Sequence, residues 1–197
     1  NQLVGVFIRF RLRTVALMGD IRRFYHSVRI PACDRNLHRY FWYRDGKLNS
    51  PIQELRLRIH LFGGNASQSA CTLALLDCLE QAVIQSKLTQ EEAEKIARSL
   101  YSDDLLASFD TIEVAVPTII KAIKALGDDK FVLGKFVSNN IECLQQLPPE
   151  SRAPEVIDAI IEDKTGTALG MKWSYDTDCI LFQYETPSDI TTKRSLL

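Results

Sequence analysis

The pattern of apolar and polar positions predicts several strands in the first third of the chain. Residues 14–20 form an apolar run that ends in a carboxylate, which is typical of a strand buried on both faces. Residues 39–42 and 55–61 are predicted strands on either side of a turn at Asp45 and Gly46, and the second run alternates apolar with basic side chains. The pattern indicates a buried strand followed by a hairpin with one basic face.

Helical spacing dominates the middle of the chain. From Asn65, a candidate N-cap, apolar residues recur with the period of a long amphipathic helix. Thr89 and Glu92 match a capping box and predict a second, shorter helix. Residues 111–126 also have helical periodicity, and Pro117 either kinks this helix or marks its true first turn.

A pair of acidic residues between two strand-like segments is the most unusual feature of the sequence. Asp103 and Asp104 lie between residues 99–102 and 105–108, which predicts two strands joined by a tight acidic turn. Pairing of adjacent antiparallel strands would bring these carboxylates to Asp20, which lies far earlier in the chain. Taken one at a time, a solvated acidic turn and a helix-capping aspartate are the simpler interpretations.

The order of the elements predicts an α+β fold. A strand, a hairpin, helices, a strand-turn-strand unit, a helix and a further strand at 130–136 fit a ferredoxin-like antiparallel sheet with helices on one face. Residues 172–175 and 179–184 predict a second hairpin, and a proline-rich stretch before it reads as a linker. With 197 residues the chain is expected to form a single domain.

Composition narrows the class of protein. The apolar share of 46% and charged share of 25% are ordinary for globular domains, and no apolar run approaches the roughly 18 residues of a membrane span. The five cysteines are scattered and odd in number, which favours reduced thiols inside a cell over a disulfide framework or a zinc site.

The net charge of −1 hides an asymmetry between the two parts of the chain. Residues 1–60 hold twelve Arg or Lys against four Asp or Glu, whereas residues 61–197 hold twelve against twenty-one. The basic part interleaves arginines with aromatic side chains, a composition suited to phosphates and bases. A solvated arginine face is the equally simple alternative.

Convergent carboxylates are what phosphoryl transfer requires. The reaction needs charge neutralised on the attacking and leaving oxygens, which two divalent ions roughly 4 Å apart accomplish. Hard oxygen ligands favour Mg²⁺ or Mn²⁺. Asp20, Asp103 and Asp104 are therefore candidate ligands of two such ions.

Five segments resemble, in the same order, the motifs of a polymerase palm, and the match covers nearly the whole chain. They are residues 15–25 (motif A), 62–68 (motif B), 101–106 with its Tyr-Ser-Asp-Asp (motif C), 130–139 (motif D) and 169–173 (motif E). The chain is identified as similar to reverse transcriptases, and the sequence that flanks the motifs most resembles that of the BEL/Pao group of LTR retrotransposons.

The resemblance implies roles for the residues of motif A and motif C. Asp20, Asp103 and Asp104 match the metal-binding positions, and the backbone carbonyl of Ile21 is an expected extra ligand. Tyr25 matches the steric gate, whose ring occupies the space that a ribose 2′-hydroxyl needs. Deoxynucleotides are therefore the expected substrates.

The other motifs imply contacts to the nucleotide and to the primer. Lys135 matches the motif D lysine that contacts or protonates the departing pyrophosphate, with an exposed edge-strand lysine as the alternative. Phe62 and Gly63 are expected near the nucleotide. Gly170 and Trp173 are expected in the primer grip, although a buried aromatic accounts equally well for Trp173.

Motif B departs from the family at one position. Gln68 stands where relatives usually have Pro. Phe62 stands where retroviral enzymes carry a nucleotide-contacting Gln, a difference that BEL/Pao elements share. The role of Gln68 is open at this stage.

The resemblance also divides the chain into parts. It assigns residues 1–30 and 62–145 to the palm, 31–61 to a partial fingers hairpin, 146–165 to a linker and 166–197 to the primer grip and the start of the thumb. The fingertips and most of the thumb are expected outside this chain, so the fragment alone is expected to be inactive even if it binds metal.

The expected function is RNA-directed DNA polymerisation as part of a retrotransposon polyprotein. The implied partners are an RNA or DNA template with a primer, deoxynucleoside triphosphates, and protease, RNase H and integrase domains, with no membrane. By analogy the protein works in cytoplasmic particles and the nucleus. Two alternatives stay open: an RNA-dependent RNA polymerase palm, which Tyr25 disfavours, and a decayed or co-opted fragment that binds nucleic acid without catalysis.

Overall fold

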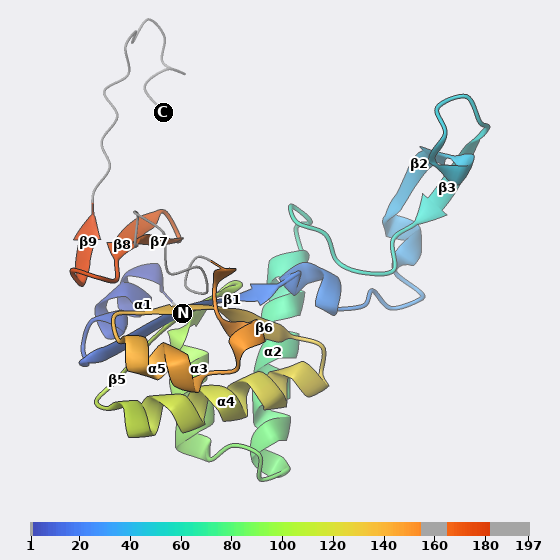
Figure 1. Cartoon of the computed structure of the whole chain (residues 1–197). Helices are drawn as coiled ribbons and strands as arrows, with labels where there is room; N and C mark the ends of the chain where they lie inside the picture. Colours follow the sequence, from blue (N-terminus) through green and yellow to red (C-terminus); the bar gives the residue numbers. More distant parts are fainter. Residues whose placement is uncertain (1, 155–164, 182–197) are drawn as a thin grey trace, which may run out of the picture.

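A four-stranded antiparallel sheet lies at the centre of the computed structural model, which describes residues 2–154 and 165–181 (Figure 1). Its order is β4-β5-β1-β6, and every neighbouring pair is antiparallel. The strands are β1 (Val15–Arg22), β4 (Leu100–Tyr101), β5 (Asp104–Phe109) and β6 (Val132–Ser138). The predicted α+β class is confirmed.

Side-chain alternation divides the apolar residues of β1 between two cores. Val15, Leu17 and Ile21 join the larger core under the helices, whereas Ala16 and Met18 join a smaller core on the opposite face. Successive side chains of a strand point to opposite faces of a sheet, so a continuous apolar run serves both cores. The prediction of a strand buried on both faces is confirmed.

Four helices pack on the larger core: α2 (Ser67–Ile84), α3 (Gln90–Ser99), α4 (Ile112–Asp128) and α5 (Ile141–Gln146). The predicted capping box is present, because the Thr89 hydroxyl accepts from the Glu92 backbone N–H while the Glu92 carboxylate accepts from that of Thr89. The predicted N-cap at Asn65 was wrong, since α2 begins at Ser67. Pro117 lies inside α4.

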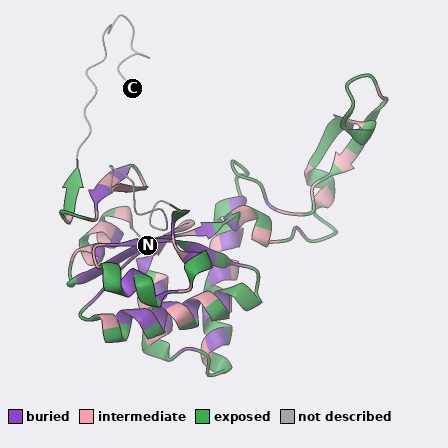
Figure 2. Ribbon diagram, in the orientation of Figure 1, coloured by how far each residue is buried: buried purple, intermediate pink, exposed green. Residues whose placement is uncertain are grey.

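The opposite face of the sheet is also covered, so the expectation of helices on one face only was wrong. Helix α1 (Leu3–Phe10) packs there with a small sheet of β7 (Thr165–Ala168), β8 (Met171–Ser174) and β9 (Cys179–Leu181). In Figure 2 the central strands are buried from both sides. The reason lies in Val6 and Phe10, one helical turn apart, which together bury an apolar face against Met18 and Trp173.

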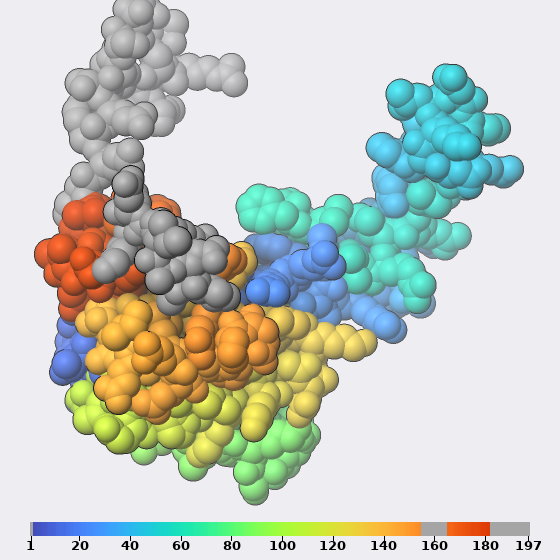
Figure 3. All heavy atoms as spheres, viewed as in Figure 1, coloured from blue at the N-terminus to red at the C-terminus, as the bar shows by residue number. Residues whose placement is uncertain are grey.

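The hairpin predicted around Asp45 and Gly46 extends away from the central sheet and its helices, as Figures 1 and 3 show. It pairs β2 (Arg39–Tyr43) with β3 (Ile52–Arg56) in one antiparallel ladder. The predicted turn at Asp45 and Gly46 has positive φ at both residues, 57° and 69°. The predicted strand 55–61 was wrong in its bounds: the ladder ends at Arg56, and farther along only an isolated bridge between Arg29 and Ile59 remains.

Two predicted segments fall partly outside the described residues. Of the predicted linker 146–165, the structure describes the 3-10 turn Pro149–Ser151 and the chain as far as residue 154. Of the predicted segment 166–197, it describes residues 166–181. None of the helices in the described parts has the length and apolar content that a membrane crossing needs.

Candidate functional site

Strand register brings two predicted site residues face to face. Asp20 of β1 and Asp104 of β5 are direct cross-strand partners. Both share the strand face that carries Met18 and Leu106, the face that α1 covers and that lies opposite α2–α5. Side chains directly opposite on antiparallel strands lie about 5 Å apart at Cβ. Two residues far apart in sequence therefore place carboxylates beside each other.

Asp103 enters the site from the turn that joins β4 to β5. Tyr101 pairs with Asp104, which leaves Ser102 and Asp103 as a two-residue loop. Ser102 has a φ of 59°, and positive φ at the first loop position is a feature of tight hairpin turns. The Ile21 backbone N–H donates to the Asp103 carbonyl at 2.8 Å, so the turn is tied to β1. The Ile21 side chain is buried, and its predicted role as a carbonyl ligand stays a prediction.

The electrostatics of the corner favour positive charge. Burial, and next the negative charges of Asp103 and Asp20, raise the pKa of Asp104 to about 6. Lys135 and a hydrogen bond from the backbone N–H of Leu169 act in the opposite direction. An acid whose ionised form is disfavoured by its neighbours gains from any cation that binds beside it.

Lys135 supplies one such cation. Its Nζ lies 2.7 Å from Asp20 Oδ2. The ladder between β1 and β6 shifts register between Met18 and Asp20, and Lys135 has a φ of 54° in the irregular stretch. Such bulges re-aim side chains next to functional sites. The predicted lysine therefore reaches Asp20 from the middle of a strand.

Gly19 allows β1 and β6 to approach at this irregularity. A Cβ added at Gly19 would lie 2.8 Å from a ring carbon of Phe136 and 3.3 Å from the Gly134 carbonyl oxygen. These distances are too short for any other residue without displacing the Phe136 ring, which is fully buried. Close packing of β1 against β6 thus explains why the residue directly before Asp20 is a glycine.

The donor chemistry of this corner fits a hard divalent cation, because carboxylate oxygens are the preferred ligands of Mg²⁺ and Mn²⁺. Asp20, Asp104 and Lys135 line a cavity of about 280 Å³ between the central sheet and β7. Within residues 2–154 and 165–181, however, no group of three or more His, Cys, Asp or Glu side chains is already arranged to hold a metal ion.

Tyr25 lies close to this corner in the 3-10 turn Phe24–Ser27. Its ring makes edge contacts with the rings of Phe24 and Phe62, with centroids 5.3 and 5.7 Å apart. Phe62 is 87% exposed, and Gly63 beside it has a φ of 85°. Three of the predicted nucleotide-site residues, Tyr25, Phe62 and Gly63, are therefore brought together.

Gln68 joins this group, although the sequence left its role open. Its Oε1 accepts hydrogen bonds from the Tyr25 hydroxyl at 2.5 Å and from the Ser102 hydroxyl at 3.0 Å. A cavity of about 610 Å³ opens beside Gln68, Tyr101 and Ser102. This cavity is therefore bordered by Ser102, the first residue of the turn that carries Asp103.

The two predicted primer-grip residues have different environments. Gly170 lies with Leu169 in the turn between β7 and β8, where their φ values of 79° and 53° are both positive. Trp173 is fully buried and packs edge-on against Phe10 at 4.9 Å. The alternative considered from the sequence, a buried aromatic, describes the side chain of Trp173. The place of Gly170 and Trp173 in a primer grip stays a prediction.

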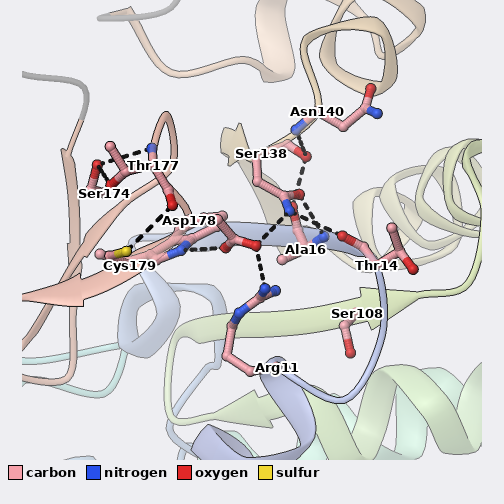
Figure 4. A network of polar contacts seen from close by, with 12 residues as sticks. Arg11, Thr14, Ala16, Ser108, Ser138, Asn140, Ser174, Thr177, Asp178 and Cys179 are labelled. Carbon is pink, nitrogen blue, oxygen red and sulfur yellow. Dashed lines mark hydrogen bonds and ion pairs between the residues drawn. The ribbon is translucent and has the colours of Figure 1, made fainter.

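A network around Asp178, which sequence reasoning missed, fixes the position of the small sheet (Figure 4). One carboxylate oxygen accepts from the Trp173 indole N–H at 3.1 Å. The other accepts from the Asn139 amide at 3.1 Å and from the Arg11 guanidinium. Asp178 therefore connects β8 and β9 to the ends of α1 and β6. An acidic residue in a turn gives no sequence signal of such a role.

Comparisons with known proteins add no assignment. A scan against models of protein families and a search of curated proteins both give no match for this chain. The interpretation of the site rests on its geometry and on the resemblance of its sequence motifs.

Proposed function

We propose that this chain is the palm of an RNA-directed DNA polymerase, which adds deoxynucleotides to a primer 3′-hydroxyl under the direction of a template. The single observation that carries the proposal is the cross-strand pairing of Asp20 with Asp104 beside the turn that presents Asp103. Two carboxylates from distant motifs face each other here, with a third acid on the adjoining turn, and acids that converge in this way are what phosphoryl transfer by two metal ions requires.

Sheet topology supports the palm assignment. The order β4-β5-β1-β6, with helices between β1 and β4 and between β5 and β6, is that of a ferredoxin-like fold. In this proposal the β2–β3 hairpin is the partial fingers and the sheet β7-β8-β9 is the primer grip. The hairpin presents exposed Phe41 and Trp42 among arginines, side chains suited to template bases and phosphates.

Asp20, Asp103 and Asp104 would hold the divalent ions, whose chemistry when bound is to neutralise charge on the attacking and leaving oxygens. The primer 3′-hydroxyl gives its proton to solvent as its oxygen forms a bond to the α-phosphorus, while the bond from that phosphorus to the bridging oxygen breaks and pyrophosphate leaves. In this proposal the Lys135 ammonium, which lies 2.7 Å from Asp20, donates a proton to that leaving group.

Tyr25 selects the sugar in this proposal. Its ring, confined between Phe24 and Phe62, occupies the space beside the 2′ carbon and excludes a hydroxyl there. Phe62 and Gly63 contact the nucleotide from the loop before α2. The substrates are therefore deoxynucleoside triphosphates, and the protein functions with the other domains of a retrotransposon polyprotein.

The experiment is primer extension by the full-length protein that contains these residues, with an RNA template, a DNA primer and Mg²⁺. Extension should require Mg²⁺ and should be lost in Asp20→Asn and Asp104→Asn. Asp110→Asn is the matched control, because Asp110 directly follows β5 but is exposed and pairs with Arg13 at the surface. Absence of extension by the unmodified protein would refute the proposal.

A second candidate, a nucleic-acid-binding module without catalysis, is favoured by one observation. The ammonium of Lys135 forms an ion pair with Asp20, one of the three proposed metal ligands. The same assay separates the two candidates, since this module would retain the primer-template in a gel-shift measurement while producing no extension. Equal use of ribonucleotides would instead identify an RNA polymerase.

A further inference from the structure

Gln68 lies where two parts of the candidate site meet. It belongs to the first turn of α2, and its side-chain oxygen accepts from two hydroxyls at once. One hydroxyl belongs to Tyr25, which follows β1, and the other to Ser102, which begins the turn between β4 and β5. One amide oxygen has two lone pairs, so both bonds are satisfied by a single acceptor.

The orientation of the Gln68 amide is also fixed. Its nitrogen donates to the Thr72 hydroxyl at 3.3 Å, one turn farther along α2. With the nitrogen directed along the helix, the oxygen is directed toward Tyr25 and Ser102. A long side chain on a helix surface is thereby held as a bridge between three separate elements.

The hydrogen bond to Gln68 fixes the position of the Tyr25 hydroxyl, which the ring contacts of Tyr25 do not set. Edge contacts with Phe24 and Phe62 confine the ring sideways, but they do not fix how far the hydroxyl end reaches along the ring axis. The hydrogen bond of 2.5 Å sets that reach. In the proposed polymerase, this is the direction that decides whether a 2′-hydroxyl fits.

The bond to Ser102 acts on the acidic turn. Ser102 has a φ of 59°, a backbone conformation that non-glycine residues adopt only when their surroundings hold them. Its hydroxyl bond to Gln68 is one such contact, and the next residue is Asp103. Gln68 thus contacts the group that selects the sugar and the turn that presents a carboxylate.

We infer that Gln68 is a positioning residue that couples sugar selection at Tyr25 to the geometry of the Ser102–Asp103 turn. The inference rests on the proposed function and deepens it by adding a determinant of substrate specificity. It also gives a physical role to the position at which motif B departs from its relatives, because proline has no side-chain acceptor for either hydroxyl.

The kinetic test compares kcat/KM for deoxy- and ribonucleoside triphosphates on an RNA template with a DNA primer. Gln68→Met, which keeps the length but removes the acceptor, should lower the discrimination ratio about tenfold. Tyr25→Phe should lower it by a similar factor, and the double variant should lower it no further, because both changes break the same bond. Gln68→Glu, which keeps an acceptor, should restore most of the discrimination.

Two further variants separate the branches of the bridge. Ser102→Ala should lower kcat for deoxynucleotides severalfold and should lower the discrimination ratio by a smaller factor than Gln68→Met does, since it breaks only the bond to the turn and leaves the bond to Tyr25 in place. Gln81→Met is the matched control, because Gln81 is exposed on the same helix and lies far from the site. It should change neither kcat nor the ratio.

A second measurement does not depend on activity. The effects of Tyr25→Phe and Gln68→Met on the melting temperature should be non-additive. Each change should lower the melting temperature less in the presence of the other than it does alone. Strict additivity would overturn the inference whatever the kinetics. So would an unchanged discrimination ratio in Gln68→Met of an active enzyme, whereas lack of extension by the unmodified protein would refute the proposed function itself.

Discussion

Two carboxylates of this protein, Asp104 and Asp178, lie on the same side of the central sheet and have opposite environments. Asp178 accepts hydrogen bonds from an indole, an amide and a guanidinium. Burial, and next the charges of Asp103 and Asp20, raise the pKa of Asp104 to about 6, in spite of Lys135 and the Leu169 backbone N–H. One acid is surrounded by hydrogen-bond donors, whereas the other is partly buried beside two further acids.

The difference teaches which acid serves the fold. The donors around Asp178 satisfy both of its carboxylate oxygens and hold the small sheet against α1, so the role of this carboxylate is structural and complete within the protein. Asp104 is held in an environment that disfavours its charge. Such an arrangement is stabilised only when a cation from outside joins it, which is the property expected of a ligand-binding residue.

The largest expected effect is on catalysis. Asp104→Asn should lower Mg²⁺-dependent primer extension about a thousandfold, because losing one ligand of the ions removes about 4 kcal/mol of transition-state stabilisation. Asp178→Asn should lower it by less than about tenfold. Single-nucleotide incorporation measures both. An equal loss in the two variants would erase the distinction between the two acids.

The next effect is on stability and should run the other way. Asp178→Ala should lower the free energy of unfolding by about 2 kcal/mol, because the buried indole N–H of Trp173 loses its acceptor. Urea unfolding measures it. Asp110→Ala is the matched control: Asp110 and Arg13 form an exposed pair, and breaking it should cost about 0.5 kcal/mol or less. Similar losses in both variants would contradict the structural role of Asp178.

A smaller effect should depend on pH. The raised pKa of Asp104 means that the folded state keeps a proton that the unfolded state has already lost between about pH 4 and pH 6. The contribution of this group to stability is therefore complete below pH 4 and is lost as pH rises through 6. In EDTA, Asp104→Asn should be more stable than the unmodified protein by about 1.5 kcal/mol at pH 7.5, after allowance for partial exposure.

The same comparison should vanish at low pH. At pH 4 and below, Asp104 is protonated in the folded protein, and asparagine replaces a neutral group of similar shape. Chemical unfolding at a series of pH values should show the stability difference growing between pH 4 and pH 6. A constant stability difference between the two proteins across this range would mean that ionisation of Asp104 does not destabilise the folded protein.

The smallest effect concerns the backbone at Lys135. Its φ of 54° favours glycine, so Lys135→Gly should be more stable than Lys135→Ala by about 0.5–1 kcal/mol, although both lose the contact with Asp20. Thermal unfolding measures the pair. A more stable alanine variant would place Lys135 in ordinary strand geometry and would remove the explanation for how its side chain reaches Asp20.

The sequence predicted the elements whose periodicity is strong. The apolar run before Asp20 and the capping box at Thr89 each follow from local chemistry. The predicted acidic turn is shifted by one residue, because the loop is Ser102–Asp103 and Asp104 begins β5, where it pairs with Asp20. Local signals sufficed here because each strand or helix is stabilised by its own pattern of buried residues.

The remaining features depend on contacts between distant residues. No pattern of residue types marks the bulge that directs Lys135 toward Asp20, because the shape of the bulge is set by packing against Gly19. Helix α1 is short and mostly apolar, so its sequence does not show which face is buried, and only the second core does. The bond between Tyr25 and Gln68 joins side chains that no periodicity relates.

The burial of Trp173 has a consequence for spectroscopy. The chain has two tryptophans, and the other, Trp42, is 54% exposed on the β2–β3 hairpin. Their emission should therefore differ in wavelength and in access to a quencher such as iodide. In a Trp42→Phe variant, intrinsic fluorescence would report on the small sheet alone. In a Trp173→Phe variant, the fluorescence would report on the hairpin. Tryptophan fluorescence can therefore follow the packing of the small sheet separately from the proposed template binding at the hairpin.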